Sequence, residues 1–81
     1  MKKITGVDWL EFSFKEQKNF TGIVKWHSGR KEFFTNGLFH RIDGPAVIRA
    51  DRFVEYWING KLVSREAQEL YYSLLKLKGL L

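Results

Sequence analysis

Residue types that commonly carry out chemistry are sparse in this 81-residue chain. His40, Arg41 and Asp43 stand close together and could in principle form a catalytic or metal-binding group. A metal site needs three or four converging ligands, whereas the chain has one other histidine, His27, and no cysteine. The lack of cysteine also excludes disulfides, thiolate ligands and a cysteine nucleophile. We therefore predict no metal and no cofactor.

The serines give no sign of catalysis either. They fall in predicted strand, turn or helix segments with no base at predictable reach, and the chain has no Gly-rich phosphate loop and no Gly-x-Ser-x-Gly motif. His40 is expected opposite Phe33 in a sheet, so we interpret it as a half-buried histidine with satisfied hydrogen bonds. The prediction that follows is a non-enzymatic protein.

The charged residues bear on a second kind of function, the binding of a charged partner. The chain has 14 Lys and Arg against 9 Asp and Glu, a formal net charge of +5. Basic and aromatic residues are interleaved at Lys25, Trp26, His27, Arg30 and Lys31, which is typical of nucleic-acid binding. The basic residues are nevertheless spread along the chain, and a charge of +5 also serves solubility. Nucleic-acid binding and protein binding both stay open on charge alone.

Turn signals indicate the elements that position these residues. Asn36-Gly37 and Asn59-Gly60 are typical of two-residue type I′ hairpin turns, and we interpret Ser28-Gly29 as a third two-residue turn. Residues 9–14 alternate in apolar character and predict another strand. An antiparallel β-meander of about five to seven short strands is therefore expected over residues 8–63.

A period of 23 residues separates the two Asn-Gly pairs. The same offset aligns Val24 with Val47, Glu32 with Glu55, Phe33 with Tyr56, and Phe34 with Trp57. Two strands in each unit predict tandem 23-residue hairpin repeats that stack edge to edge.

The apolar spacing after these strands changes to that of an α-helix over residues 65–78, begun by Ser64 and ended by Gly79. The expected apolar stripe consists of Ala67, Leu70, Tyr71, Leu74 and Leu75. Either the sheet of the same chain or a second copy must cover it. The sheet is favoured, because a small single-layer sheet needs a second layer. The prediction is one α+β domain over residues 1–81 with one C-terminal helix, a monomer or a homodimer through that helix.

Two-residue turns would fix the register of the first strands. Lys25 then faces Glu32, and Glu32 faces Arg41, which makes a charged ladder on one face. The opposite face, expected to meet the helix, carries Val24, Trp26, Phe33, Leu38 and Ile42. Glu55 faces Ile48 in this register and so lacks a basic partner, which favours it for an outward contact.

Two motifs resemble a known family. Residues 57–61 (Trp-Ile-Asn-Gly-Lys), the partial copy at 34–37, and residues 40–46 (His-Arg-Ile-Asp-Gly-Pro-Ala) are similar to repeats of small phage and bacterial proteins. Those repeats have the pattern Trp-x-Asn-Gly-Lys…His-Arg-x-Asp-Gly-Pro-Ala and are similar in turn to the variant MORN repeats of antitoxin-like proteins. The resemblance covers roughly residues 20–65 and departs at 63–67, as a capping repeat would. It implies a hairpin array that serves as a non-enzymatic binding scaffold.

The leading functional hypothesis is a protein-binding module, a small phage or accessory inhibitor or antitoxin-like factor, that acts through a sheet face and turn residues. Trp, Tyr and Arg anchor many protein interfaces. The predicted contacts are Trp9, His27, Arg30, Arg52 and Glu55. Core filling is an equally good interpretation of Trp9. The alternative is a nucleic-acid-binding protein that uses Lys25, Trp26, Arg30 and Lys31.

The start of the chain and its hydropathy bear on location. Asp8 and Glu11 interrupt any apolar segment after the opening Met-Lys-Lys, so we expect no signal peptide and a cytoplasmic protein. No apolar run approaches the ~20 residues of a membrane span, so no membrane partner is expected.

Overall fold

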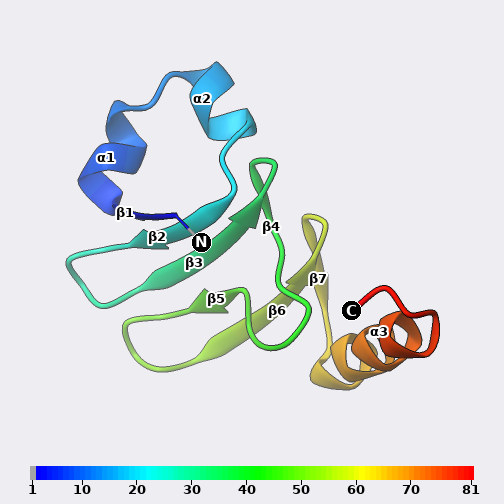
Figure 1. The fold of residues 1–81 in the computed structure, drawn as a ribbon. Coiled ribbons are helices and arrows are strands. Elements are labelled where there is room, and N and C mark those ends of the chain that lie inside the picture. The colour runs from blue at the N-terminus through cyan, green and yellow to red at the C-terminus, as the bar shows by residue number, and fades with distance from the viewer. Residues whose placement is uncertain (1) are drawn as a thin grey trace.

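The computed structural model describes residues 2–81 as one mostly antiparallel seven-stranded sheet with three helices (Figure 1). In chain order the elements are β1 (Lys3–Thr5), α1 (Gly6–Glu11), α2 (Phe14–Lys18), β2 (Gly22–Lys25), β3 (Lys31–Thr35), β4 (Leu38–Phe39), β5 (Val47–Ile48), β6 (Val54–Ile58), β7 (Lys61–Val63) and α3 (Arg65–Leu77). The strand order is β1-β2-β3-β5-β6-β7, and β4 pairs with β3. The predicted α+β class, with a meander and a C-terminal helix, is confirmed. None of the helices in residues 2–81 is long and apolar enough to cross a membrane.

The strand predicted over residues 9–14 is wrong, because two short helices occupy this region. At the start of α1 the Thr5 hydroxyl accepts the Asp8 N–H (3.1 Å), and the Asp8 carboxylate accepts the Thr5 N–H (3.0 Å). Ser13 and Glu16 form the same reciprocal pair at the start of α2. Each pair satisfies two backbone donors that a helix start otherwise leaves free, which outweighs a weak strand-like alternation. The meander therefore begins only at β2.

The Asn-Gly turns form as predicted. Phe34 pairs with Phe39 across the first turn, and Trp57 pairs with Leu62 across the second. The two asparagines adopt positive φ angles of 49° and 48°, and each is followed by a glycine with positive φ, as a type I′ turn requires.

The turn between β2 and β3 is one residue longer than predicted. The Trp26 N–H donates to the Arg30 carbonyl (2.8 Å), so residues 27–29 form a three-residue loop that ends at Gly29 with φ 99°. Lys25 consequently pairs with Lys31 rather than with Glu32. A shift of one residue moves every side chain of β2 to the other face relative to β3.

The predicted Lys25–Glu32–Arg41 ladder is wrong for a second reason as well. β4 ends at Phe39, and β5 then takes its place beside β3, where Val47 pairs with Glu32. Arg41 lies in the loop between β4 and β5 instead, and its N–H donates to the Trp57 carbonyl (3.2 Å).

The observed register sorts the strand residues onto two faces, because directly paired residues point to the same side. The inner face carries Ile4, Val24, Trp26, Glu32, Phe34, Phe39, Val47, Glu55, Trp57 and Leu62. The outer face carries Lys3, Ile23, Lys25, Lys31, Phe33, Leu38, Ile48, Val54, Tyr56 and Lys61. The prediction that Val24 and Trp26 share a face with Phe33 and Leu38 is therefore wrong.

Aromatic side chains from the N-terminal region cover the inner face over β2, β3 and β4. The Trp9 ring stacks on Phe34 with 4.6 Å between centroids, and Phe20 packs edge-on against both rings. The core cluster consists of Phe20, Val24 and Phe34, with Ile4, Trp9, Phe12, Trp26 and Phe39 packed against it. The second layer of the fold thus comes from α1, α2 and the segment that follows them.

The C-terminal helix α3 packs on β6 and on the loop at residues 40–46. Its buried Gln68 side chain donates to the carbonyls of Arg41 (2.9 Å) and Gly44. Of the predicted apolar stripe, Tyr71 and Leu75 are half-buried, whereas Ala67, Leu70 and Leu74 are exposed. The helix therefore begins and ends nearly where predicted but leaves most of its apolar stripe uncovered.

Candidate protein-binding surface

Two turns lie side by side at one end of the sheet. They join β2 to β3 (residues 27–29) and β5 to β6 (residues 49–53), and they are neighbours because Lys31 of β3 pairs with Ile48 of β5 (Figure 1). The register places four inner-face residues beside these turns, which we call the anchor row: Trp26, Arg30, Arg49 and Phe53. The next row inward is Val24–Glu32–Val47–Glu55. Glu32 therefore lies directly behind Arg30, whereas Glu55 lies behind Phe53 and diagonally behind Arg49.

Glu32 holds one half of the anchor row in place. Its carboxylate accepts the Trp26 indole N–H (2.7 Å) and pairs with the Arg30 guanidinium (2.7 Å). The Glu32 side chain is 9% exposed, so solvent screens this pair little. A buried carboxylate with two such donors is fully compensated, which fixes both Trp26 and Arg30.

Glu55 holds the other half. The Arg49 Nη2 and Nε atoms donate to one carboxylate oxygen (2.6 and 2.9 Å), and the Trp57 indole N–H donates to the other (2.9 Å). These bonds, first that from Trp57 and then that from Arg49, lower the pKa of Glu55, and the same carboxylate raises the pKa of Arg49. The prediction that Glu55 lacks a partner is wrong, because β5 brings Arg49 beside it.

The structure brings four of the five predicted contact residues to this end of the sheet. Arg30 and Glu55 lie in the two glutamate clusters, while His27 and Arg52 are exposed in the two turns. Trp9 is the exception, since its ring packs in the core. Core filling, the other interpretation of this residue, matches its place.

Phe53 belongs to the anchor row but was not predicted. Its side chain is 69% exposed, and its N–H donates to the Asp51 carboxylate (3.1 Å), which tightens the turn before β6. Arg52 adopts a positive φ of 75° in the same turn. The sequence signal for Phe53 is an aromatic residue two positions after a turn-forming aspartate.

The four residues of the predicted nucleic-acid site do not form one surface. Lys25 and Lys31 lie on the outer face, whereas Trp26 and Arg30 lie on the inner face and are both bonded to Glu32.

The residues of the histidine motif at 40–43 contact neighbouring residues of the fold. The His40 Nδ1 atom accepts the Asn59 N–H (2.9 Å), and burial lowers the pKa of the ring. Arg41 pairs with Asp43 (3.0 Å), and its guanidinium lies 4.1 Å from the centre of the Phe33 ring. The interpretation of His40 as half-buried and satisfied is confirmed. Across residues 2–81, no three His, Asp or Glu side chains gather closely enough to hold a metal.

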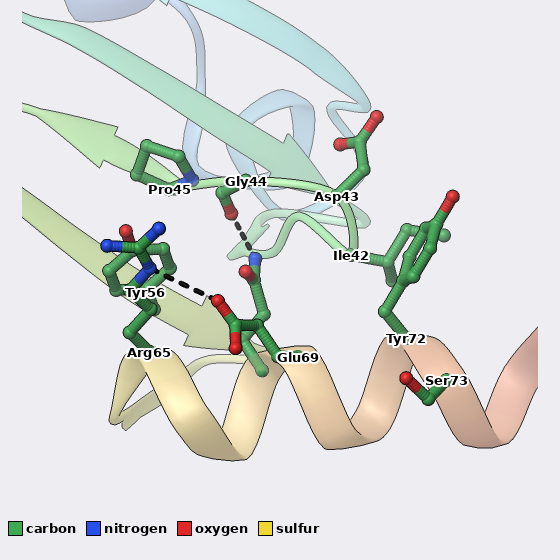
Figure 2. A pocket seen from close by; sticks show the side chains of 10 residues that line it. Ile42, Asp43, Gly44, Pro45, Tyr56, Arg65, Glu69, Tyr72 and Ser73 are labelled. Atoms are coloured by element: carbon green, nitrogen blue, oxygen red, sulfur yellow. Dashed lines mark hydrogen bonds and ion pairs between the residues drawn. The ribbon is translucent and has the colours of Figure 1, made fainter.

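A groove of about 580 Å³ lies between α3 and the loop at residues 40–46 (Figure 2). Its lining includes Asp43, Tyr56 and Tyr72, and Arg65 pairs with Glu69 along α3 (3.2 Å). In the described part of the chain every buried side-chain nitrogen and oxygen has a hydrogen-bond partner, so no unpaired buried group points into this groove. The groove therefore offers no unpaired buried group to a ligand, and we take the anchor row as the stronger candidate.

No protein-family model, no curated protein and no solved structure matches the chain. The resemblance to MORN-like hairpin repeats accordingly stays a prediction.

Proposed function

We propose that the chain is a non-enzymatic protein-binding module whose contact surface is the anchor row together with the two turns beside it. The observation that carries this proposal is one row at an edge of the inner face, in which the exposed Arg49 and Phe53 lie beside the half-buried Trp26 and Arg30. Tryptophan and arginine are the residue types most enriched among the residues that dominate binding energy. The role we propose is that of a small accessory or phage inhibitor or antitoxin-like factor in the cytoplasm.

The arginine side chains of the anchor row are held in place within the chain itself, which supports this proposal. Glu32 and Glu55 already hold the arginine side chains, so a partner would not have to immobilise them. Phe53 offers exposed apolar area, and Arg52 next to it takes part in none of the ion pairs found among residues 2–81. The fitting partner is a segment with a carboxylate for the arginines and an apolar side chain for Phe53.

A random peptide library selected on the immobilised protein would test this proposal. We expect enrichment of acidic peptides that contain an aromatic or aliphatic residue. The double variant Arg52→Glu with Phe53→Ser should weaken their binding by at least about tenfold, the size of one hot-spot loss.

The matched control is Phe14→Ser with Arg65→Glu, which changes another exposed phenylalanine and another exposed arginine far from the anchor row. This control should bind the selected peptides within about twofold of the unchanged protein. Equal weakening by both double variants, or no enrichment of acidic peptides, would count against the anchor row.

A second candidate, self-association through α3, rests on its uncovered apolar stripe. Ala67, Leu70, Leu74 and Leu77 follow the alternating three- and four-residue spacing of a helix-pairing seam, and all are exposed. The first half of the helix carries Glu66 and Glu69, and the end carries Lys76 and Lys78. An antiparallel second copy would bring these opposite charges together. We therefore propose a homodimer through α3.

Sedimentation equilibrium over a range of protein concentrations tests the dimer. Leu70→Glu with Leu74→Glu should leave only monomer, whereas Val7→Glu with Leu10→Glu, at exposed positions of α1, should leave the dimer intact. If the unchanged chain were a monomer at every concentration, self-association would be refuted. The peptide selection, which tests the anchor row, would be unaffected.

A further inference from the structure

Charged residues within the strands divide by face. All four strand lysines, Lys3, Lys25, Lys31 and Lys61, lie on the outer face. Both strand glutamates, Glu32 and Glu55, lie on the inner face, where arginine and tryptophan side chains engage them. The charged residues on the outer face of the strands are therefore all lysines, whereas the incorrect sequence register paired Lys25 with Glu32.

Three of these lysines form one group over β1, β2 and β3, which we call the lysine face. Lys25 lies directly opposite Lys31, and Lys3 lies beside Ile23, two residues from Lys25 along β2. All three side chains are exposed. None of the ion pairs found within residues 2–81 includes any of them.

The Lys25–Lys31 pair also has a cost. Two like charges directly opposite each other on neighbouring strands repel and weaken the pairing. The longer turn at residues 27–29 is what places them together, since a two-residue turn would have given Lys25 a glutamate. A polyanion bound across the strands would remove this repulsion.

We propose that the lysine face binds the phosphate backbone of single-stranded nucleic acid. The ligand is inferred to be a chain of phosphates and not a single anion, because the lysines are spread over three strands about 4.8 Å apart and not gathered in a cavity. A flexible single strand can follow such a row, and lysines contact phosphates without reading sequence.

The composition of the lysine face favours nucleic acid over a lipid surface. Membrane binding by a basic surface is strengthened by large apolar side chains that insert between the headgroups. On the outer face of β1, β2 and β3, Ile23 is buried and Phe33 is half-buried beside the Arg41 guanidinium, and Thr5 next to Lys25 is polar. This site is on the opposite face from the anchor row, so it is independent of the proposed protein contact.

Fluorescence anisotropy with a labelled oligo(dT) of about 20 nucleotides tests the proposal. For three phosphate contacts we expect the logarithm of affinity to fall with the logarithm of salt concentration at a slope of about −2. The triple variant Lys3→Gln, Lys25→Gln, Lys31→Gln should lose at least about tenfold in affinity at low salt and most of the salt dependence.

The matched control, Lys15→Gln with Lys18→Gln and Lys78→Gln, removes the same number of charges from exposed positions off the lysine face. It should stay within about twofold of the unchanged protein. The lysine-face variant should also melt no earlier than the unchanged protein, because its loss of Lys–Lys repulsion favours the sheet. Earlier melting would contradict the repulsion on which the inference partly rests.

Three results would overturn the inference. Equal loss of affinity in both triple variants would mean that only the net charge matters. Binding to phosphatidylserine vesicles without binding to oligo(dT) would assign the face to a lipid surface. An absence of oligo(dT) binding at low salt would remove the site altogether.

Discussion

The two hairpins β2–β3 and β5–β6 place the same residue types at corresponding positions but differ in what covers them. Val24 and Val47 are both fully buried, and each pairs with a glutamate that binds one tryptophan and one arginine. The Glu32 side chain is 9% exposed, against 19% for Glu55. Aromatic side chains from the N-terminal region pack on the first hairpin in the core cluster, which includes no residue of the second hairpin. The same strand pattern thus builds part of the core in one place and a more open surface in the other.

The largest expected difference in the free energy of unfolding is between alanine substitutions at Phe34 and at Trp57. These residues lie 23 positions apart, at corresponding places in the two hairpins. Phe34 is 6% exposed and contacts the rings of Trp9, Phe20 and Phe39, so Phe34→Ala should lower the free energy of unfolding by about 3–5 kcal/mol. Trp57 is half-buried, and Trp57→Ala should cost about 1–2 kcal/mol. Urea denaturation followed by circular dichroism measures both. Equal losses would mean that the second hairpin is covered as well as the first.

Substitution of the glutamate should likewise lower the free energy of unfolding more in the first hairpin than in the second. Glu32→Ala would leave the half-buried Trp26 indole N–H without its acceptor and the Arg30 guanidinium, whose side chain is 35% exposed, without its partner, and we expect a loss of about 1–3 kcal/mol. Glu55→Ala should cost about 1 kcal/mol or less, because the Arg49 side chain is 48% exposed and can return to water. Chemical denaturation near neutral pH gives both values. A larger loss for Glu55→Ala would reverse the comparison.

The glycines of the two Asn-Gly turns differ in the space that a larger side chain would have. Gly37 and Gly60 have φ angles of 76° and 80°, so alanine is strained at both by about 1–2 kcal/mol. A Cβ atom at Gly37 would also lie 2.6 Å from the Lys18 Cα and carbonyl oxygen of α2, whereas at Gly60 its nearest neighbour is the Leu38 Cδ2 atom at 3.2 Å. Gly37→Ala should therefore lower the melting temperature clearly more than Gly60→Ala. Equal shifts would show that α2 moves away freely.

Features fixed by a few neighbouring residues were predictable from the sequence. The Asn-Gly turns and the helix from Arg65 to Leu77, capped by Ser64, depend on local backbone preferences and appear as predicted. The capping pairs Thr5–Asp8 and Ser13–Glu16 are an equally local signal, and they start α1 and α2 in the region where apolar alternation alone predicts a strand.

The contacts that make the candidate surfaces depend on tertiary pairing instead. One extra residue in the turn at 27–29 moves Lys25 from Glu32 to Lys31 and so creates the lysine face. Arg49 reaches Glu55 because β5 pairs with β6 in a register that places Val47, and not Ile48, opposite Glu55. Loop length and strand exchange are decided by packing of the whole sheet, so spacing alone could place His27, Arg30 and Arg52 but not their neighbours.

The smallest expected effect concerns the contact between the two Asn-Gly hairpins, β3–β4 and β6–β7. The His40 Nδ1 atom accepts the Asn59 N–H, and burial holds the pKa of His40 below its ordinary value. The unfolded chain therefore binds a proton more readily than the folded one. The contribution of His40 is fully present above the ordinary histidine pKa and is lost as pH falls from there toward the lowered value.

Unfolding measured between about pH 7 and about pH 5 should show a loss of less than about 1 kcal/mol from this group. His40→Asn should remove that part of the pH dependence. His27→Asn, in the exposed turn between β2 and β3, should retain it. If both variants kept the full dependence, the Asn59 contact would not be sensitive to protonation. The backbone bonds from Arg41 to Trp57 and from Gly60 to Phe39, with the packing of Phe39 on Trp57 at 5.2 Å between ring centres, would then hold this contact together.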